Sequence, residues 1–352
     1  MHRRKEVITV IVLVTLAAFA TSFIAGSAPG LRRLADGARS IDITIVALGL
    51  LCSGLAMVNR GMLNRAAHRA VGLDAGVGEM THTAAVGFAA QKMVKSAGAV
   101  GLAVFIRHGR RNGYEPGSVA AACVLTATAS FVALGVLLVA AIGVLVVTDR
   151  FSGWWIAAAA GFAIYSALVG VFVAVIVRSR RIATRAWQWG QQTRRRLFGG
   201  RSSAPDAAFP VEMFDAFSVA RCRPDGLRQL LMHAVASKIL GALMLVVAVK
   251  AAGLPVGPPG ALVIYATALA ASMVTIVPGG FGVVEGSTAA LLVAAGASGG
   301  AAALAVALFR LFDLWLPVLT GAAFARRALR HEEPAPHADS PRVPAVIAPT
   351  AA

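Results

Sequence analysis

Charged residues are scarce in this chain: they make up 14% of its 352 residues, whereas a soluble domain carries roughly 25%. This scarcity excludes an ordinary soluble globular domain. Hydrophobic residues make up 58% of the chain, and the mean hydropathy is +0.74. Several apolar runs match the roughly 20 residues that a membrane-spanning helix needs. The sequence therefore predicts an all-α polytopic membrane protein.

Cysteine is also scarce, with only Cys52, Cys123 and Cys222 present. An odd number without paired spacing provides neither a disulfide framework nor a metal site. Cys52 and Cys123 lie in apolar runs, and we interpret them as small buried hydrophobic residues.

Acidic residues are outnumbered, because 16 Asp and Glu face 33 Lys and Arg and give a formal net charge of +17. Nucleic-acid binding would need a folded basic soluble domain, and the sequence shows none. Most basic residues instead lie in short segments between apolar runs, as in cytoplasmic loops that face anionic lipid. We therefore expect no nucleic-acid partner.

Motifs of soluble enzymes are missing as well. The sequence contains no P-loop, no HExxH helix and no CxxC pair. Residues 296–300 fit the GxSxG pattern, but that motif needs a strand-to-helix turn, and here it joins two apolar segments. We interpret it as a flexible turn, and we expect neither enzymatic activity nor a cofactor.

Apolar segments follow one another along the whole chain. They cover residues 7–25, 43–58, 83–105, 118–147, 153–177, 231–252, 261–277, 283–297 and 301–325. The first follows a basic N-terminus as in a signal peptide, but it is long enough to span and lacks a clear cleavage site. We therefore expect an uncleaved first helix.

The distribution of basic residues favours one topology. If segment 83–105 dips in from the cytoplasm and 261–297 enters from outside, cytoplasmic segments hold twenty-four of the 33 basic residues, Arg60 among them, and outside loops hold four. This bias satisfies the positive-inside rule. A full span at 83–105 would instead move the basic residues at 107–111 outside. We therefore predict two re-entrant segments and cytoplasmic termini.

Two broken segments that enter from opposite sides are typical of inverted repeats, which place substrate near the bilayer midplane. We predict a bundle of about eight transmembrane segments over residues 1–330, and a disordered Pro/Ala-rich tail at 331–352. Residues 178–230 are expected to form a basic cytoplasmic loop. Its first part, 180–198, is either an amphipathic interfacial helix or a solvated linker.

A break in the second half is the most distinctive element, with Pro278, Gly279, Gly280 and Gly282 followed by Glu285. Lipid offers no hydrogen bonds to an opened backbone, so the break must be buried in protein or line a polar cavity. A helix that begins near Gly282 would place Glu285 in its first turn, where the helix dipole favours a carboxylate. Glu285 is then either a cap or part of a charged cavity that holds a lipid head group.

A buried carboxylate needs a cationic partner. The cations within apolar segments are Lys92, Lys95, Lys238 and Arg310. Arg310 shares a helix face with Asp313, so it either forms a local ion pair or turns to Glu285 or a phosphate. Lys92 and Lys95 are candidates for phosphate binding in a re-entrant turn. For these lysines and for Lys238, snorkelling to the interface is the favoured interpretation.

Two motifs resemble those of a known family. The element Pro278-Gly279-Gly280-x-Gly282-x-x-Glu285 precedes Arg310-Leu311-Phe312-x-x-Trp315-Leu316-Pro317-x-x-x-Gly321. Together they resemble the C-terminal signature of the lysylphosphatidylglycerol synthase transmembrane-region family, a flippase-like integral membrane domain. Glu285 and Arg310 match that family's glutamate and arginine. Segment 92–117 resembles its first-half element, although the expected proline is absent and lysines are added.

The resemblance implies a bacterial inner-membrane protein linked to lipid handling. Members fused to a soluble aminoacyltransferase domain make and flip aminoacylated phosphatidylglycerol, but this sequence shows no such domain, so we expect no lysyl transfer. The expected function is binding or translocation of an anionic phospholipid or a polyprenyl-linked intermediate. Two alternatives stay open: a glycosyl or acyl transferase that uses a lipid-linked donor with Asp36 or Asp42 as the acid, and a non-transporting partner of envelope-biosynthesis proteins.

Overall fold

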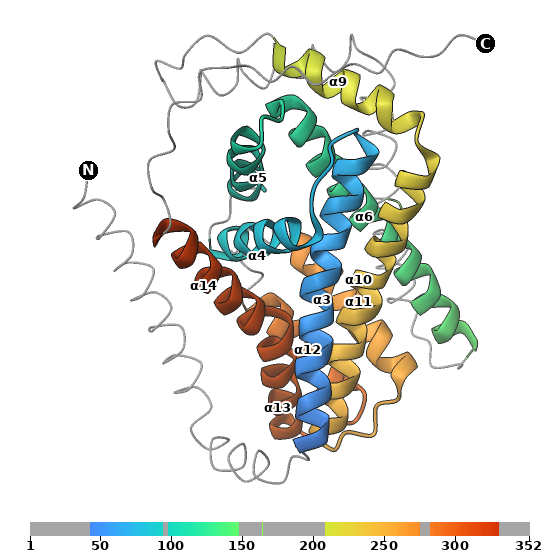
Figure 1. Cartoon of the computed structure of the whole chain (residues 1–352). Helices are drawn as coiled ribbons and strands as arrows, with labels where there is room; N and C mark the ends of the chain where they lie inside the picture. The colour runs from blue at the N-terminus through green and yellow to red at the C-terminus, as the bar shows by residue number, and fades with distance from the viewer. Residues whose placement is uncertain (1–42, 94–97, 148–163, 165–207, 275–281, 331–352) are drawn as a thin grey trace, which may run out of the picture.

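A computed structural model describes residues 43–93, 98–147, 164, 208–274 and 282–330 (Figure 1). The elements in these ranges are helices: α3 (Ile43–Ala70), α4 (Val77–Met93), α5 (Ala99–Arg111), α6 (Pro116–Val147), α9 (Ala208–Arg221), α10 (Pro224–Ala251), α11 (Pro258–Val274), α12 (Val283–Ala294), α13 (Gly299–Arg310), the π-helix η2 (Leu311–Trp315) and α14 (Leu316–Arg330). Within these ranges, four helical stretches are long and apolar enough to cross a membrane: Ile43–Ala70, Pro116–Ala141, Pro224–Ala251 and Gly299–Arg327. The predicted all-α polytopic membrane fold is confirmed.

Helix α3 extends well beyond the apolar run that predicts it. The run ends at residue 58, but the helix continues to Ala70 and is about 42 Å long at 1.5 Å per residue. Its last turns contain alanine and leucine and no proline, so nothing in them breaks a helix. Gly72 ends it with a φ of 90°, while the Leu73 N–H donates to the His68 carbonyl, as in a Schellman motif.

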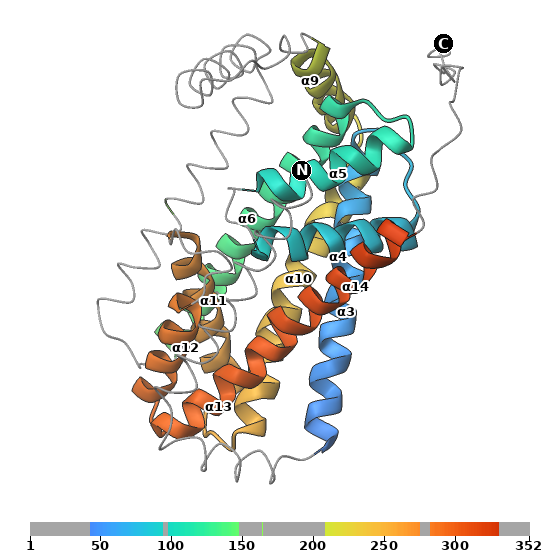
Figure 2. The same cartoon turned by 90° about the vertical axis from the view of Figure 1, so that its left-hand side faces the viewer.

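Helices α4 and α5 form a hairpin that returns to the end of the bundle where it started. Asn112 donates to the Glu79 carboxylate at 2.8 Å, and the Tyr114 hydroxyl donates to the Asp74 carbonyl. These bonds tie the start of the hairpin to its end. Figures 1 and 2 show α3 ending and α6 beginning on this same side. Segment 83–105 therefore turns back, as its basic flanks predict.

Helices α11 and α12 form the corresponding hairpin at the opposite end. At that end α10 terminates and α13 starts. The helices that connect them in the chain, α11 and α12, pack against each other (Figure 2). The ends of α10 and α12 close alike, because the Leu254 N–H donates to the Val249 carbonyl and the Ala297 N–H to the Leu292 carbonyl. Each half of the described chain thus contains one hairpin.

The two halves have the same order of elements in opposite directions. The first half runs from the long helix α3 through the hairpin α4–α5 to the long helix α6. The second runs from α10 through the hairpin α11–α12 to the last helix, α13–η2–α14. Helices α3 and α10 run antiparallel along each other (Figure 1). This is the arrangement of the predicted inverted repeat.

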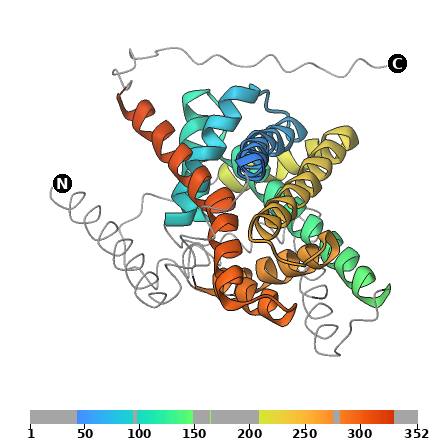
Figure 3. The same cartoon turned by 90° about the horizontal axis from the view of Figure 1, so that it is seen from below.

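Helix α3 packs against α4, α6, α10 and η2, and Figure 3 shows it nearly end-on among them. Small residues allow these close approaches. A Cβ added at Gly61 would meet Thr81 of α4, and one added at Gly321 of α14 would meet the Ala85 carbonyl and the Ala89 side chain. Helix α4 therefore packs closely between α3 and α14, and these contacts fix the position of the first hairpin.

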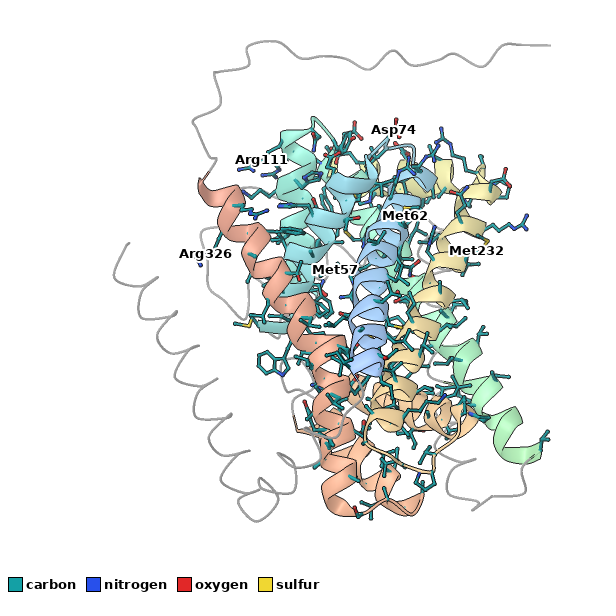
Figure 4. The ribbon with its side chains drawn as sticks, turned by 60° about the horizontal axis from the view of Figure 1, so that its bottom comes forward. Met57, Met62, Asp74, Arg111, Met232 and Arg326 are labelled. Carbon is teal, nitrogen blue, oxygen red and sulfur yellow. The ribbon has the colours of Figure 1, made fainter. Side chains whose placement is uncertain are left out.

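Basic side chains gather where α5 ends, and Figure 4 shows Arg111 there on the same side as Asp74. Helix α9 lies within the predicted 178–230 loop, so the end of that loop is helical. The apolar segments 7–25 and 153–177, the stretch 180–198 and the tail 331–352 lie outside the described residues, and the predictions for them stay predictions.

Candidate functional site

An ion pair joins α12 to α13 inside the second half. The Arg310 Nε donates to the Glu285 Oε1 at 2.5 Å, and the two side chains are 6% and 15% exposed. Gly282, with a φ of 80°, precedes α12 and places Glu285 in its first turn, as the sequence predicts. Removing one partner of such a pair would leave the other charge buried and uncompensated.

Aromatic packing fixes Arg310 from the side of α10 and α11. Phe309, which precedes it, lies edge-on to the Tyr265 ring, with 6.1 Å between the ring centroids. The Tyr265 hydroxyl rests on α10 at Gly241, where a Cβ would have no room. Tyr265 and Phe309 are both buried. Three helices thus hold the end of α13 in place.

The π-helix η2 follows Arg310, and a proline in the sequence explains where this π-helix ends. The Leu316 N–H donates five residues back, to the Leu311 carbonyl. The next donor in this register would come from Pro317, which has no N–H. The Phe312 carbonyl instead accepts a hydrogen bond from the buried Ser53 hydroxyl of α3 at 2.7 Å. Such π-turns are frequent at functional sites, and this one contains Asp313.

Four charged residues gather around η2, and we call them the central charge cluster: Arg60, Lys92, Lys238 and Asp313. Arg60 and Lys238 both interact electrostatically with Asp313, and Lys92 lies close enough to Lys238 to repel it. The Arg60 guanidinium lies 3.6 Å from the Phe88 ring centroid, and the Lys92 Nζ lies 5.3 Å from it. The cluster therefore joins α3, α4, α10 and η2.

Two members of this cluster correct the sequence-based interpretation. Arg60 lies within α3 rather than in a loop, because the helix continues through it to Ala70. Lys238 is not at the start of its span: α10 begins at Pro224, so Lys238 lies at its midpoint, about 21 Å along the axis. Asn59 fixes the register of α3 against α10 by donating to the His233 carbonyl at 2.9 Å.

The ion pair and the central charge cluster are neighbours along one helix. Arg310 and Asp313 are three residues apart, or about 4.5 Å along the axis. Glu285, Arg310, Asp313 and the cluster's cations thus form one polar region inside the bundle. Its charged residues are four cations and two carboxylates, so their formal charges sum to a net positive value.

Two buried oxygen atoms in this region have no hydrogen-bond partner within the described part of the chain: Glu285 Oε2 and Thr288 Oγ1. They are one turn apart on α12 and therefore share a face. Thr288 is fully buried. Buried polar groups are nearly always paired, so two orphans on one face call for an explanation.

The structure describes only some of the other predicted residues. Pro278, Gly279, Gly280 and Lys95 lie outside the described residues, as do Asp36 and Asp42 of the transferase alternative. Lys92 and Asp313 belong to the central charge cluster. Within the described ranges, no group of three or more His, Cys, Asp or Glu side chains is placed to hold a metal ion.

Several residues of the polar region are not singled out by the sequence patterns. The helical position of Arg60 could have been predicted, because no proline lies between residues 58 and 70. Ser53 and Thr288 carry no signal, because single hydroxyl residues are common in apolar segments. Their positions depend on which helices meet.

A separate polar contact joins the start of α4 to the end of α5 in the first hairpin. The His108 Nε2 lies 2.8 Å from the Glu79 Oε1. Burial lowers the pKa of His108 below its ordinary value, although the Glu79 carboxylate acts in the opposite direction. His108 is therefore mostly neutral at pH 7, and its contact with Glu79 is a hydrogen bond rather than a salt bridge.

Comparison with known proteins agrees with the motifs. A search of the curated proteins found no match. The family model for the lysylphosphatidylglycerol synthase transmembrane region matches residues 7–321, which include Glu285, Arg310 and the central charge cluster. Membrane proteins of this family are related to lipid handling. The chain belongs to the lysylphosphatidylglycerol synthase transmembrane-region family.

Proposed function

We propose that this protein binds the anionic head group of a membrane lipid or lipid-linked intermediate inside its helix bundle and moves it across the bacterial inner membrane. The observation that carries the proposal is that cations from two helices, Arg60 of α3 and Lys92 of α4, meet at the Phe88 ring, within electrostatic range of Lys238 and Asp313. The family context supplies the link to lipid.

The energetic argument starts from the cost of charge at this depth. A cation inside the bilayer is expensive unless it is paired or lines a cavity, so intramembrane cations indicate functional sites. Arg60 and Lys238 lie close enough to repel each other, and Asp313 is within electrostatic range of both. A phosphate group would relieve this repulsion. An arginine fork and a lysine ammonium are both standard phosphate ligands.

Arg310 extends the proposed site toward the opposite end of the bundle. Its guanidinium fits a phosphate as well as it fits a carboxylate. In the structure Glu285 accepts from it, so Glu285 holds the place that a phosphate would take. Exchange of one anion for the other keeps Arg310 paired throughout.

The paired hairpins favour movement over simple binding. One hairpin reaches the polar region from each end of the bundle, and inverted halves of this kind give transporters equivalent paths to either side. Acyl chains would stay in lipid, because the charged residues lie inside the bundle.

Lipid retention tests the binding step. The wild-type protein and the variants Lys238→Met and Arg60→Gln would be purified from membranes and examined by native mass spectrometry for co-purified anionic lipid. Lys250→Met is the matched control, since Lys250 lies on the same helix but is exposed. We expect wild type and the control to retain anionic lipid and the two cluster variants to lose it. Equal retention by all four proteins would contradict the proposal.

Transport is tested separately in proteoliposomes. A fluorescent phosphatidylglycerol placed in both leaflets is bleached from outside with dithionite, and the fraction protected from bleaching reports movement. We expect more bleaching with wild type than with Lys238→Met. Retention of lipid without any movement would reduce the proposal to lipid binding.

A further inference from the structure

The aromatic ring of Phe88 lies where two cations of the central charge cluster meet. The Arg60 Cζ is 3.6 Å from the ring centroid, and the Lys92 Nζ is 5.3 Å from it. Both distances are within the roughly 6 Å over which an aromatic face attracts a cation. Arg60 belongs to α3, whereas Phe88 and Lys92 are four residues apart on α4 and therefore share a face. A single ring thus gathers cations from two helices.

The ring of Phe88 is itself held in place by apolar packing. It contacts a cluster of three buried residues: Ala89 of α4, Leu314 of η2 and Val318 of α14. Leu314 directly follows Asp313, the carboxylate of the central charge cluster. The position of the ring is therefore set by the packing of α4 against the last helix of the bundle.

The two arginines of the polar region are held by different means. Arg310 donates to the Glu285 carboxylate, which cancels its formal charge and has to leave before a phosphate can bind. Within the described part of the chain, the Arg60 guanidinium forms no ion pair, and Asp313 acts on it at electrostatic range. The ring attracts the guanidinium through its quadrupole and carries no net charge. Arg60 is therefore held in place and keeps its positive charge.

We propose that Phe88 is a positioning residue of the lipid site: its ring holds the Arg60 guanidinium beside Lys92 without cancelling its charge, and this arrangement receives a phosphate group. Because the ligand is the phosphate of the bound lipid, this proposal rests on the proposed function. It adds where that phosphate binds, at the contact between α3 and α4. A cation that is already ordered costs less to fix when the ligand arrives, so preorganisation raises the affinity.

The other position open to Arg60 shows why the ring matters. Asp313 is within electrostatic range, and a guanidinium released from the ring would pair with this carboxylate. A phosphate would then have to displace a carboxylate from Arg60, as it does at Arg310. Loss of the aromatic face should therefore weaken binding without abolishing it. We expect the Kd to rise roughly tenfold, which is the size of a desolvated cation–π contact.

Fluorinated phenylalanines in place of Phe88 test the proposal with almost no change of shape. Each fluorine draws electron density from the ring face and weakens its attraction for a cation. The full-length protein in detergent is titrated with fluorescent phosphatidylglycerol, with mono-, di- or trifluorophenylalanine at this position. We expect log Kd to rise in steps with the number of fluorines and to reach roughly tenfold weaker binding for the trifluoro side chain.

Natural substitutions and a matched position complete the series. Phe88→Tyr keeps the aromatic face and should bind lipid like the wild type. Phe88→Leu keeps an apolar side chain without the ring and should bind roughly tenfold more weakly. Phe217 is the control, because it is buried on α9 and no cation lies over its ring within the described ranges. Trifluorophenylalanine in place of Phe217 should leave the Kd unchanged.

The outcomes separate the role of Phe88 from the proposed function. Saturable binding with one Kd across the fluorinated series would overturn the role of the ring and leave lipid binding in place; a weak Phe88→Leu protein would then reflect packing alone. An equal rise of the Kd with trifluorophenylalanine at Phe217 would overturn that role as well. Absence of saturable binding by folded wild-type protein, with Lys238→Met and Arg60→Gln indistinguishable from it, would overturn the proposed function instead.

Discussion

The buried ion pair between Glu285 and Arg310 makes a quantitative prediction about stability. Arg310→Met leaves the Glu285 carboxylate inside the bundle without its cation, which we expect to cost about 3–5 kcal/mol of the free energy of unfolding. Glu285→Met leaves the guanidinium in the same position and has a comparable cost. Both side chains are well under one third exposed, so solvent screening offsets little of this cost.

The double variant distinguishes pairing from simple loss of contacts. Methionine at both positions removes both charges and keeps much of the volume, and replacement of a buried pair by apolar residues is often neutral. We therefore expect Arg310→Met with Glu285→Met to lie within about 1.5 kcal/mol of wild type. The coupling free energy from the cycle would then be several kcal/mol, well above the value for independent sites.

The free energies of unfolding of wild type, the two single variants and the double variant can be measured by denaturant unfolding in detergent micelles. The helical circular dichroism signal monitors the transition. Lys250→Met serves as a control, because it removes an exposed cation from a neighbouring helix and should have almost no effect. If the two single losses simply add in the double variant, the ion pair is not an energetic unit. The assignment of Arg310 as the counter-charge of Glu285 would then be refuted.

Two further predictions follow from local contacts. Ser53→Ala removes the donor to the Phe312 carbonyl, which Pro317 cannot replace, and should cost about 1–3 kcal/mol in the same unfolding assay. Thr128→Ala is the control, because its hydroxyl donates to the Val124 carbonyl of its own helix. Because burial lowers the pKa of His108, the unfolded state binds a proton before the folded state does as the pH falls. Stability should therefore decrease as the pH drops through the ordinary histidine pKa of 6.5, and His108→Gln should flatten this dependence; an unchanged slope in that variant would contradict the assignment.

The membrane class and the two hairpins follow from patterns that the sequence displays directly, whereas the choice of Arg310 among the four candidate partners of Glu285 needed the structure. Hydropathy gives the spans, and the basic flanks of segment 83–105 show that it returns. The spacing from Gly282 places Glu285 in the first turn of its helix. These inferences depend on local composition, which a single sequence contains.

Residues contributed by different helices were harder to predict. Hydropathy ends the first span at residue 58, because Asn59 and Arg60 lower the local average, although the helix propensity of the following residues is high. The position of Lys238 was misjudged for the same reason, since the polar first turns of α10 hide its true start. The central charge cluster depends on helix register, which tertiary packing determines. The binding role of Glu285, Arg310 and the other site residues stays a prediction.

The backbone contacts of α4 have a consequence for how this protein is built. Gly61 belongs to the first half and Gly321 to the second, and the absence of a Cβ at each leaves room for Thr81 and for the Ala85 carbonyl of α4. The two halves are therefore interlocked rather than placed side by side, so neither can complete its core as a separate polypeptide. A displacement of α14 would therefore act on the first hairpin directly, at the contact between Gly321 and Ala85.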